Sequence, residues 1–353
     1  MRHTAAKLFA TLAIATSLAT VAAGMASADP TVTPAAQDIV GAGSDTTQAV
    51  LNQFSTDYNA FLTGKGDTTS PRLYSWDATG TSPITPKTGA NSIARPNGSS
   101  AGVAALNANT NTTLDFARSS RAPQTGDLTS DLFVAYAKDG VSWAGNSAGN
   151  APANLTTADL LGIYTCSITN WNQITDVSGY TGPNATIDAY LPQLSSGTRA
   201  FFLKAIGGGT TVTPGSCVEA YTPEENEGTD AVFTDVNSVF PYSAAHYIGQ
   251  VYGGHTTTTD APGSLSIRSV DGTFPITSTH TLNPTFTSTN YGRNVYNVVR
   301  SGDWTATGTQ ATALKAIFGA SGWICTNATA KADLKSYGFQ TLPIGACGST
   351  THI

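Results

Sequence analysis

The sequence predicts an α/β protein with two lobes. Segments typical of strands alternate with segments typical of helices from Asp38 onward, and this order indicates sheets flanked by helices. The alternation covers about 310 residues, which is more than one compact domain usually contains, so two lobes are expected. The sequence shows no tandem repeat that would indicate a solenoid instead.

Four strands and a long amphipathic helix are predicted in the first part of the chain. The strands are residues 38–40, 72–76, 113–118 and 132–137. The helix covers residues 48–62, because apolar side chains recur there at helical spacing, namely Val50, Leu51, Phe54, Tyr58 and Phe61.

Helices and strands continue to alternate in the second part. Residues 155–164 are predicted to form a short capped helix, and residues 185–191 a strand that leads to Ser196, where another helix begins. Two apolar runs follow at residues 247–252 and 295–299, and the last helix covers residues 311–318.

The N-terminal segment is typical of a secretory signal peptide. Arg2 and Lys7 precede a stretch of apolar and small residues, and Ala26-Ser27-Ala28 is a small-x-small cleavage site. We expect cleavage after Ala28, a linker at residues 29–36, and an extracellular mature protein. No cysteine lies near the cleavage site, so neither a lipoprotein anchor nor membrane insertion is expected.

The charge of the chain argues against a nucleic acid or an anionic membrane as the partner. Removal of residues 1–28 takes away Arg2 and Lys7 and leaves 15 Lys and Arg against 23 Asp and Glu, a formal net charge of −8. A chain of that charge repels polyanions. An anionic ligand would therefore have to be bound by local donors.

Four cysteines allow three disulfide pairings: Cys166, Cys217, Cys325 and Cys347. An oxidising compartment favours Cys166–Cys217 with Cys325–Cys347, because this pairing closes two sequential loops. The other two pairings stay open. The cysteine spacing does not match a zinc site and the five histidines are scattered, so no metal or other cofactor is expected.

Three predicted helices begin in segments rich in Gly, Ser and Thr. Ser196-Gly197-Thr198-Arg199 forms the start of a helix that continues through residues 200–206, and residues 41–47 and 98–102 precede two others. The first N–H groups of a helix have no partner within it and carry the positive end of its dipole, so they suit an anion. Hydroxyl groups add neutral donors. The repetition predicts a protein that binds an oxyanion.

These segments resemble those of the PstS-like substrate-binding proteins of phosphate ABC transporters. The resemblance includes Ile168-Thr169-Asn170-Trp171-Asn172, the Ser-Gly-Thr-Arg start at residue 196, and Tyr337-Gly338-Phe339 followed by Leu342-Pro343. Residues 41–47, 98–102 and 115–123 occur in the order of the family's other ligand segments. The likeness covers nearly the whole mature chain.

The resemblance implies a two-lobed periplasmic-binding-protein fold of type II, with a monomer that binds phosphate or a related oxyanion in the cleft between the lobes. Lobe 1 would contain residues 37–132 and 245–353, and lobe 2 residues 133–244. Lobe closure would signal occupancy to an ABC permease. The implied ligand residues are Ser44, Asp45, Thr46, Ser99, Ser119, Ser120, Ser196, Gly197 and Thr198.

Two departures from the family pattern concern charge. Pro192 stands where the family places an arginine, so the positive charge is expected from Arg199, Arg118 or Arg121. Ser120 stands where the family places an aspartate that accepts the proton of phosphate. Asp45 could take over that task, or it could cap the helix that begins near Thr46.

Two other functions remain alternatives. Gly98–Gly102 and Gly145–Gly149 match the Gly-x-Ser-x-Gly pattern of serine hydrolases, with His246, His255 or His280 as the base. The chain could also be an extracellular phosphate scavenger or a surface binding protein without a permease. A binding protein is favoured and an enzyme is not expected. We interpret Glu224-Glu225-Asn226-Glu227 as a solvated turn.

Overall fold

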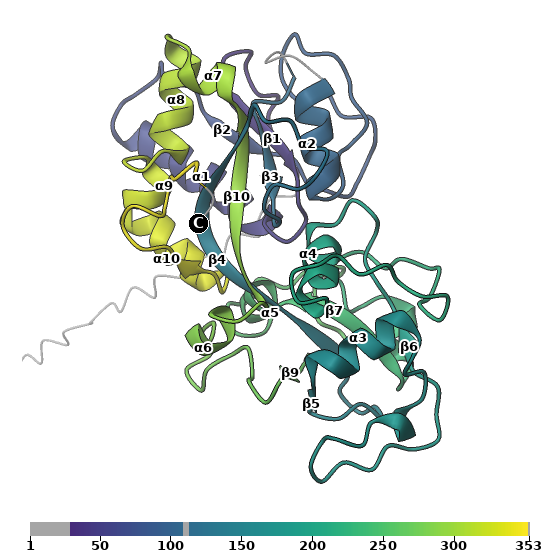
Figure 1. The fold of residues 1–353 in the computed structure, drawn as a ribbon. Helices are drawn as coiled ribbons and strands as arrows, with labels where there is room; N and C mark the ends of the chain where they lie inside the picture. Colours follow the sequence, from purple (N-terminus) through teal and green to yellow (C-terminus); the bar gives the residue numbers. More distant parts are fainter. Residues whose placement is uncertain (1–28, 109–112, 352–353) are drawn as a thin grey trace, which may run out of the picture.

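The structure is a computed structural model that describes residues 29–108 and 113–351. The predicted signal peptide and its cleavage site lie outside the described residues. Two lobes are stacked one above the other, and the long strand β4 (Asp131–Asn146) passes from one to the other (Figure 1). The α/β fold with two lobes is therefore confirmed.

The upper lobe in Figure 1 contains the N-terminal elements and the C-terminal helices. Its first elements are β1 (Ile39–Gly43), α1 (Gln48–Gly64), β2 (Leu73–Ser75), α2 (Ser99–Ala108) and β3 (Phe116–Ser119). The chain returns there through β10 (Gly292–Arg300), α7 (Ser301–Thr305), α8 (Thr309–Phe318), α9 (Trp323–Thr326), α10 (Ala328–Ser336) and β11 (Gln340–Thr341).

The lower lobe contains the middle of the chain. Its elements are β5 (Asn154–Leu155), α3 (Thr157–Thr165), β6 (Asp188–Ala189), α4 (Gly197–Ile206), β7 (Ser238–Ser243), α5 (Ala244–Val251), β8 (Leu265–Ile267), β9 (Ser269–Val270) and α6 (Pro284–Thr287). Two 3₁₀ helices, Trp171–Gln173 and Ala231–Thr234, complete the set.

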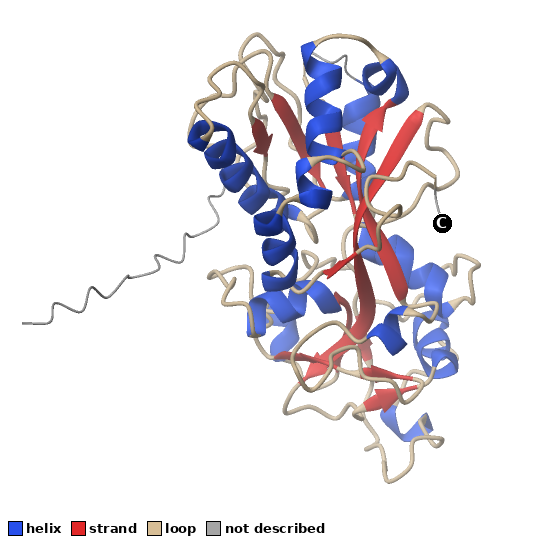
Figure 2. Ribbon diagram, turned by 90° about the vertical axis from the view of Figure 1, so that its left-hand side faces the viewer, coloured by secondary structure: helices blue, strands red, loops and turns tan. Residues whose placement is uncertain are grey.

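One mixed sheet connects the lobes. Its strand order is β2-β1-β3-β10-β4-β7-β6, with β1 parallel to β2 and β3, and β10 antiparallel to β3 and β4. The first half of β4 pairs with β10, and its second half, from Val141 to Asn146, pairs with β7 and β8. Helices α1 and α8 lie on one side of the upper strands and α2 lies on the other (Figure 1), and Figure 2 shows the same molecule turned by 90°.

The predicted strand at residues 132–137 is too short, because β4 extends to Asn146. Lys138 and Asp139 interrupt the apolar pattern there, and such an interruption usually marks a strand end. Asp139 is nevertheless fully buried, because its carboxylate receives hydrogen bonds from Ser243 and Arg293. A polar residue with partners can continue a buried strand.

Each lobe has its own hydrophobic core. Phe54, Tyr136 and Leu314 belong to the upper core, and Trp143 and Phe202 belong to the lower one. Val270, Phe286 and Tyr291 pack with the lower core as well. We therefore propose that the chain returns to lobe 1 at β10, later than the predicted boundary at residue 245.

Two disulfides stabilise the periphery, and they are the favoured pairs. Cys166–Cys217 joins the end of α3 to the loop after α4, and Cys325–Cys347 joins α9 to the C-terminal segment. Among residues 29–108 and 113–351, none of the helices has the length and apolar character that crossing a membrane requires.

Candidate functional site

Helix α4 begins where the sequence predicts. Ser196 is its N-cap and its Oγ accepts a hydrogen bond from the N–H of Arg199 at 3.0 Å. Gly197 is the first residue of the helix, and Thr198 is fully buried. The first turn of α4 faces the other lobe, where two more helices begin.

Helices α1 and α2 begin opposite α4. Thr46 precedes α1, and its Oγ1 lies 3.0 Å from Oγ1 of Thr198. Ser99 is the first residue of α2, and its Oγ accepts from the N–H of Ser120 at 3.0 Å and lies 3.3 Å from Ser120 Oγ. We call these residues the donor cluster: Thr46, Ser99, Ser120, Ser196, Gly197 and Thr198.

Two glycines allow the lobes to approach this closely. A Cβ atom at Gly197 would lie 2.3 Å from Ser99 Oγ and 2.4 Å from Ser120 Oγ. A Cβ atom at Gly98 would lie 2.4 Å from the carbonyl oxygen of Ser195, and Gly98 also has a φ of +94°. Both positions therefore require glycine, one for space and the other for space and backbone conformation.

Arg293 of β10 supplies a cation to the donor cluster. Its Nη2 donates to Thr198 Oγ1 at 3.0 Å, and its Nε donates to Asp139 Oδ2 at 2.9 Å. The guanidinium carbon lies 5.5 Å from the centre of the Phe201 ring. Its Nη1 is buried and has no hydrogen-bond partner in the part of the chain that the structure describes. This charged donor of Arg293 is therefore available to a ligand.

Two of the three arginines expected to bind the anion are engaged away from the donor cluster, and the third lies beside it. Arg121 is paired with Asp127, with Nη1 at 2.6 Å from Oδ2, and the side chain of Arg199 donates to the carbonyl oxygen of Pro192. Arg118 is buried beside the cluster, where its Nε donates to the carbonyl oxygen of Ser44 at 3.0 Å, and its Nη2 has no partner among the described residues. Burial lowers the pKa of Arg118 to about 10, so its guanidinium stays charged at neutral pH.

The other predicted site residues, Ser44, Asp45 and Ser119, are also buried. The Oγ of Ser119 donates to the carbonyl oxygen of Arg121 at 2.8 Å. Ser44 is buried with an unpartnered Oγ, judged over the described residues. The interpretation of Asp45 as a helix cap is wrong, because α1 has Thr47 as its N-cap and no side-chain cap bond. Burial raises the pKa of Asp45 well above its usual range, and Glu225 and Glu224 raise it further.

The segment Glu224-Glu225-Asn226 is not a solvated turn. Glu225 and Asn226 are fully buried between the lobes. Asn226 Nδ2 donates to Asp45 Oδ1 at 3.2 Å, and Glu225 accepts hydrogen bonds from Thr46 and Ser196. The sequence carries one hint of this, since consecutive carboxylates are unusual in a chain with only 11% charged residues.

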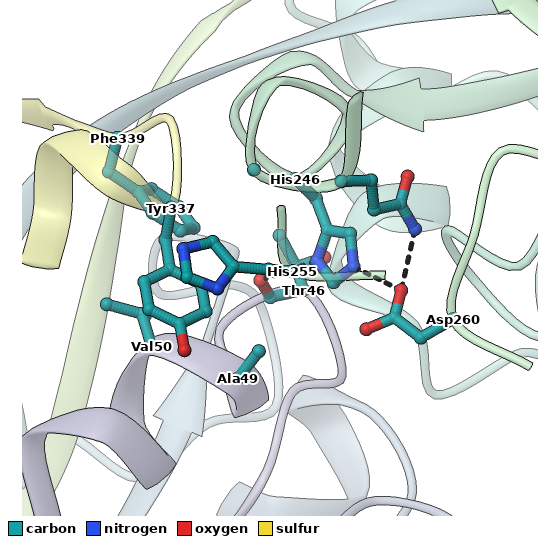
Figure 3. A pocket seen from close by; sticks show the side chains of 10 residues that line it. Thr46, Ala49, Val50, His246, His255, Asp260, Tyr337 and Phe339 are labelled. Atoms are coloured by element: carbon teal, nitrogen blue, oxygen red, sulfur yellow. Dashed lines mark hydrogen bonds and ion pairs between the residues drawn. The ribbon is translucent and has the colours of Figure 1, made fainter. Parts of the chain in front are cut away.

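A small cavity lies behind Thr46, lined by His246, Gln250, His255, Asp260 and Tyr337 among others (Figure 3). His246 Nε2 lies 2.6 Å from Asp260 Oδ1, and His255 stacks on Tyr337. Although burial disfavours the charged imidazole, Asp260 raises the pKa of His246 to about 10. The cavity measures about 10 Å³, which is room for a single water molecule.

Neither Gly-x-Ser-x-Gly segment has the geometry of a hydrolase. Ser147 lies in an exposed turn just after β4, with no helix directly behind it. Ser100 lies in the first turn of α2, where its Oγ accepts from Arg121 Nε at 3.1 Å. A catalytic serine would need a histidine at that distance.

Comparison with known proteins agrees with this architecture. The model of a family described as "PBP superfamily domain" matches residues 28–333. No curated protein matches the sequence.

Two solved structures share the fold. One is an ABC-type phosphate transport receptor from Vibrio cholerae, with 19% identity over 86% of this chain and 98% of that chain and a TM-score of 0.55. The other is a putative phosphate ABC transporter substrate-binding protein with bound phosphate from Clostridium perfringens, with 17% identity over 86% and 98% of the two chains and a TM-score of 0.56.

Proposed function

The chain belongs to the PBP superfamily, and we propose that it is an exported solute-binding protein that captures inorganic phosphate, or a similar oxyanion, for ABC-type import. One observation carries the proposal. The N-terminal ends of α1, α2 and α4 meet at the donor cluster beside the buried guanidinium of Arg293.

The chemistry of this arrangement suits a tetrahedral oxyanion. Helix N-termini and hydroxyl groups offer many donors with partial positive charge, and Arg293 adds a full charge. Three donors in this region, Ser44 Oγ, Arg118 Nη2 and Arg293 Nη1, are buried without a partner among the described residues. A buried donor without a partner is costly, so a ligand that accepts from them would stabilise the closed protein.

The position of the cluster suits a transport receptor. Its donors come from both lobes, so a bound anion would hold the lobes together, and closure of this kind can be read by a permease. The solved structures named above are phosphate transport receptors by their titles, which supports the same substrate here. The predicted signal peptide supports an extracellular location.

Calorimetry on the mature chain, residues 29–353, tests the ligand. We expect saturable binding of phosphate at one site, with weaker binding of sulfate and methylphosphonate. An absence of heat with all three anions would overturn the proposal. Phosphate uptake by cells that lack the gene tests import. If cells that lack the gene take up limiting phosphate as fast as the wild type, although the protein binds phosphate in vitro, the scavenger alternative is favoured.

A further inference from the structure

A carboxylate occupies the donor cluster. Glu225 Oε1 accepts from the N–H and from the Oγ1 of Thr46, both at 3.1 Å, and Oε2 accepts from Ser196 Oγ in a short hydrogen bond. Thr46 precedes α1 in the upper lobe, and Ser196 caps α4 in the lower lobe. One side chain therefore bonds both lobes at the point where two helices begin.

Hydrogen bonds connect this carboxylate to the cation of the site. Arg293 Nη2 donates to Thr198 Oγ1, Thr198 lies 3.0 Å from Thr46 Oγ1, and Thr46 donates to Glu225. Asn226 Nδ2 also donates to Thr46 Oγ1, so that oxygen has its own hydrogen left for Glu225. The hydroxyl groups of Thr198 and Thr46 thus form a chain of hydrogen bonds that ends at the carboxylate of Glu225.

Glu225 accepts in the manner expected of a bound anion. Glu225 accepts from the N–H of Thr46, just before α1, and from the Oγ of Ser196, which caps α4. Helix starts offer donors of this kind to oxyanions. Each of these hydrogens serves one strong acceptor at a time. An oxyanion that entered the cluster would therefore compete with Glu225 for Thr46 and Ser196.

We infer that Glu225 is a built-in competing anion, which bonds the two lobes together in the empty protein and leaves the donor cluster when an external oxyanion binds. The inference rests on the proposed function for the identity of that oxyanion. It assigns Glu225 a regulatory role, because an internal competitor lowers the apparent affinity in proportion to its own occupancy of the site. A higher concentration of ligand would then be needed to fill the site.

The nearly isosteric variant Glu225→Gln tests the competition. The amide is neutral and cannot accept from Ser196 through its NH₂ group, so phosphate should bind about tenfold tighter or more, measured by calorimetry. Glu225→Ala should give a gain at least as large. A loss of phosphate affinity, or a loss of preference for phosphate over sulfate, would overturn the inference and assign Glu225 to the proton of the ligand.

Glu224→Gln is the matched control. It removes the same charge one residue away, from a carboxylate that accepts from Asn97 and Gln193 and makes no bond to the donor cluster. We expect its phosphate affinity to change by less than about threefold, a difference of under one kcal/mol. A gain equal to that of Glu225→Gln would show a general effect of charge and overturn the inference.

Small-angle scattering without ligand separates this inference from the proposed function. The empty wild-type protein should have nearly the radius of gyration of a closed form, and the empty Glu225→Ala protein should be larger. If no variant binds phosphate but Glu225→Ala opens, the proposed ligand is wrong and the contact between lobes stands. If all variants bind phosphate and none opens or gains affinity, the inference is wrong and the proposed function stands.

Discussion

Thr46 Oγ1 and Thr198 Oγ1 lie 3.0 Å apart, although 152 residues of chain separate them. Both side chains are buried, and each lies at the start of a helix in a different lobe. The pair therefore marks the place where the lobes and two helix N-termini meet.

Thr198→Ala should weaken phosphate binding by one to two decades. The hydroxyl accepts from Arg293 and contacts Thr46, and loss of one hydrogen bond to a charged group costs about 1.5–3 kcal/mol. Thr198→Ser keeps the hydroxyl and should bind nearly as the wild type does. Calorimetry measures both, and equal affinities for the two variants would place the ligand outside the donor cluster.

Arg293 should be the arginine on which affinity depends. Arg293→Lys keeps the charge but loses the fork geometry, so we expect phosphate affinity to fall about tenfold, or ~1.4 kcal/mol. Arg293→Gln should also lower the melting temperature, because it leaves the buried Asp139 without its cation. Arg199→Gln and Arg121→Gln are the controls. A larger loss in either control than in Arg293→Lys would contradict this assignment.

Gly197→Ala should impair closure of the cleft. The added Cβ would lie 2.3 Å from Ser99 Oγ and 2.4 Å from Ser120 Oγ, which belong to the opposite lobe. We expect a drop in phosphate affinity and a larger radius of gyration with phosphate present. Gly64→Ala, at the end of α1 with open space around its Cβ position, is the control. Wild-type binding by Gly197→Ala would mean that the lobes do not approach this closely in the bound state.

Asp333→Asn should stabilise the protein at high pH. Burial raises the pKa of Asp333 to about 7, and Asp57 contributes to the rise. The folded state then keeps a proton that the unfolded chain loses near pH 4, so the free energy of unfolding falls as pH rises between about 4 and 7. The variant lacks this loss, and its gain in Tm over the wild type should grow from about pH 5 to about pH 8. A constant difference across that range would rule out the titration of Asp333 as the cause.

Local sequence patterns predicted the elements well. The apolar spacing from Val50 to Phe61 predicts α1, and Ser196 before an apolar run predicts the start of α4; both are observed. The reason is that helix periodicity and capping depend on neighbours within a few residues. The favoured disulfide pairing is also observed; it joins cysteines that are consecutive in the order of the chain, although 51 and 22 residues separate the partners.

The site residues that come from distant parts of the sequence could not be predicted from local patterns. Arg293 lies in a strand with no motif around it, and only the pairing of β10 with β4 brings it to Asp139 and Thr198. Arg121 looked suitable beside Ser120, but Asp127, six residues further along, pairs with it. An ion pair of that kind depends on loop geometry that residue types do not specify.

The sequence by itself determined the α/β class, the three Gly/Ser/Thr helix starts and their suitability for an oxyanion, because these depend on backbone chemistry that short segments carry. Only the tertiary structure decided which charges face those helix starts. It brought Arg293 in from β10 and placed Glu225 between Thr46 and Ser196. The physical reason is burial. A run of acidic residues is usually solvated, but one that both lobes cover can stay buried wherever donors from each lobe satisfy it.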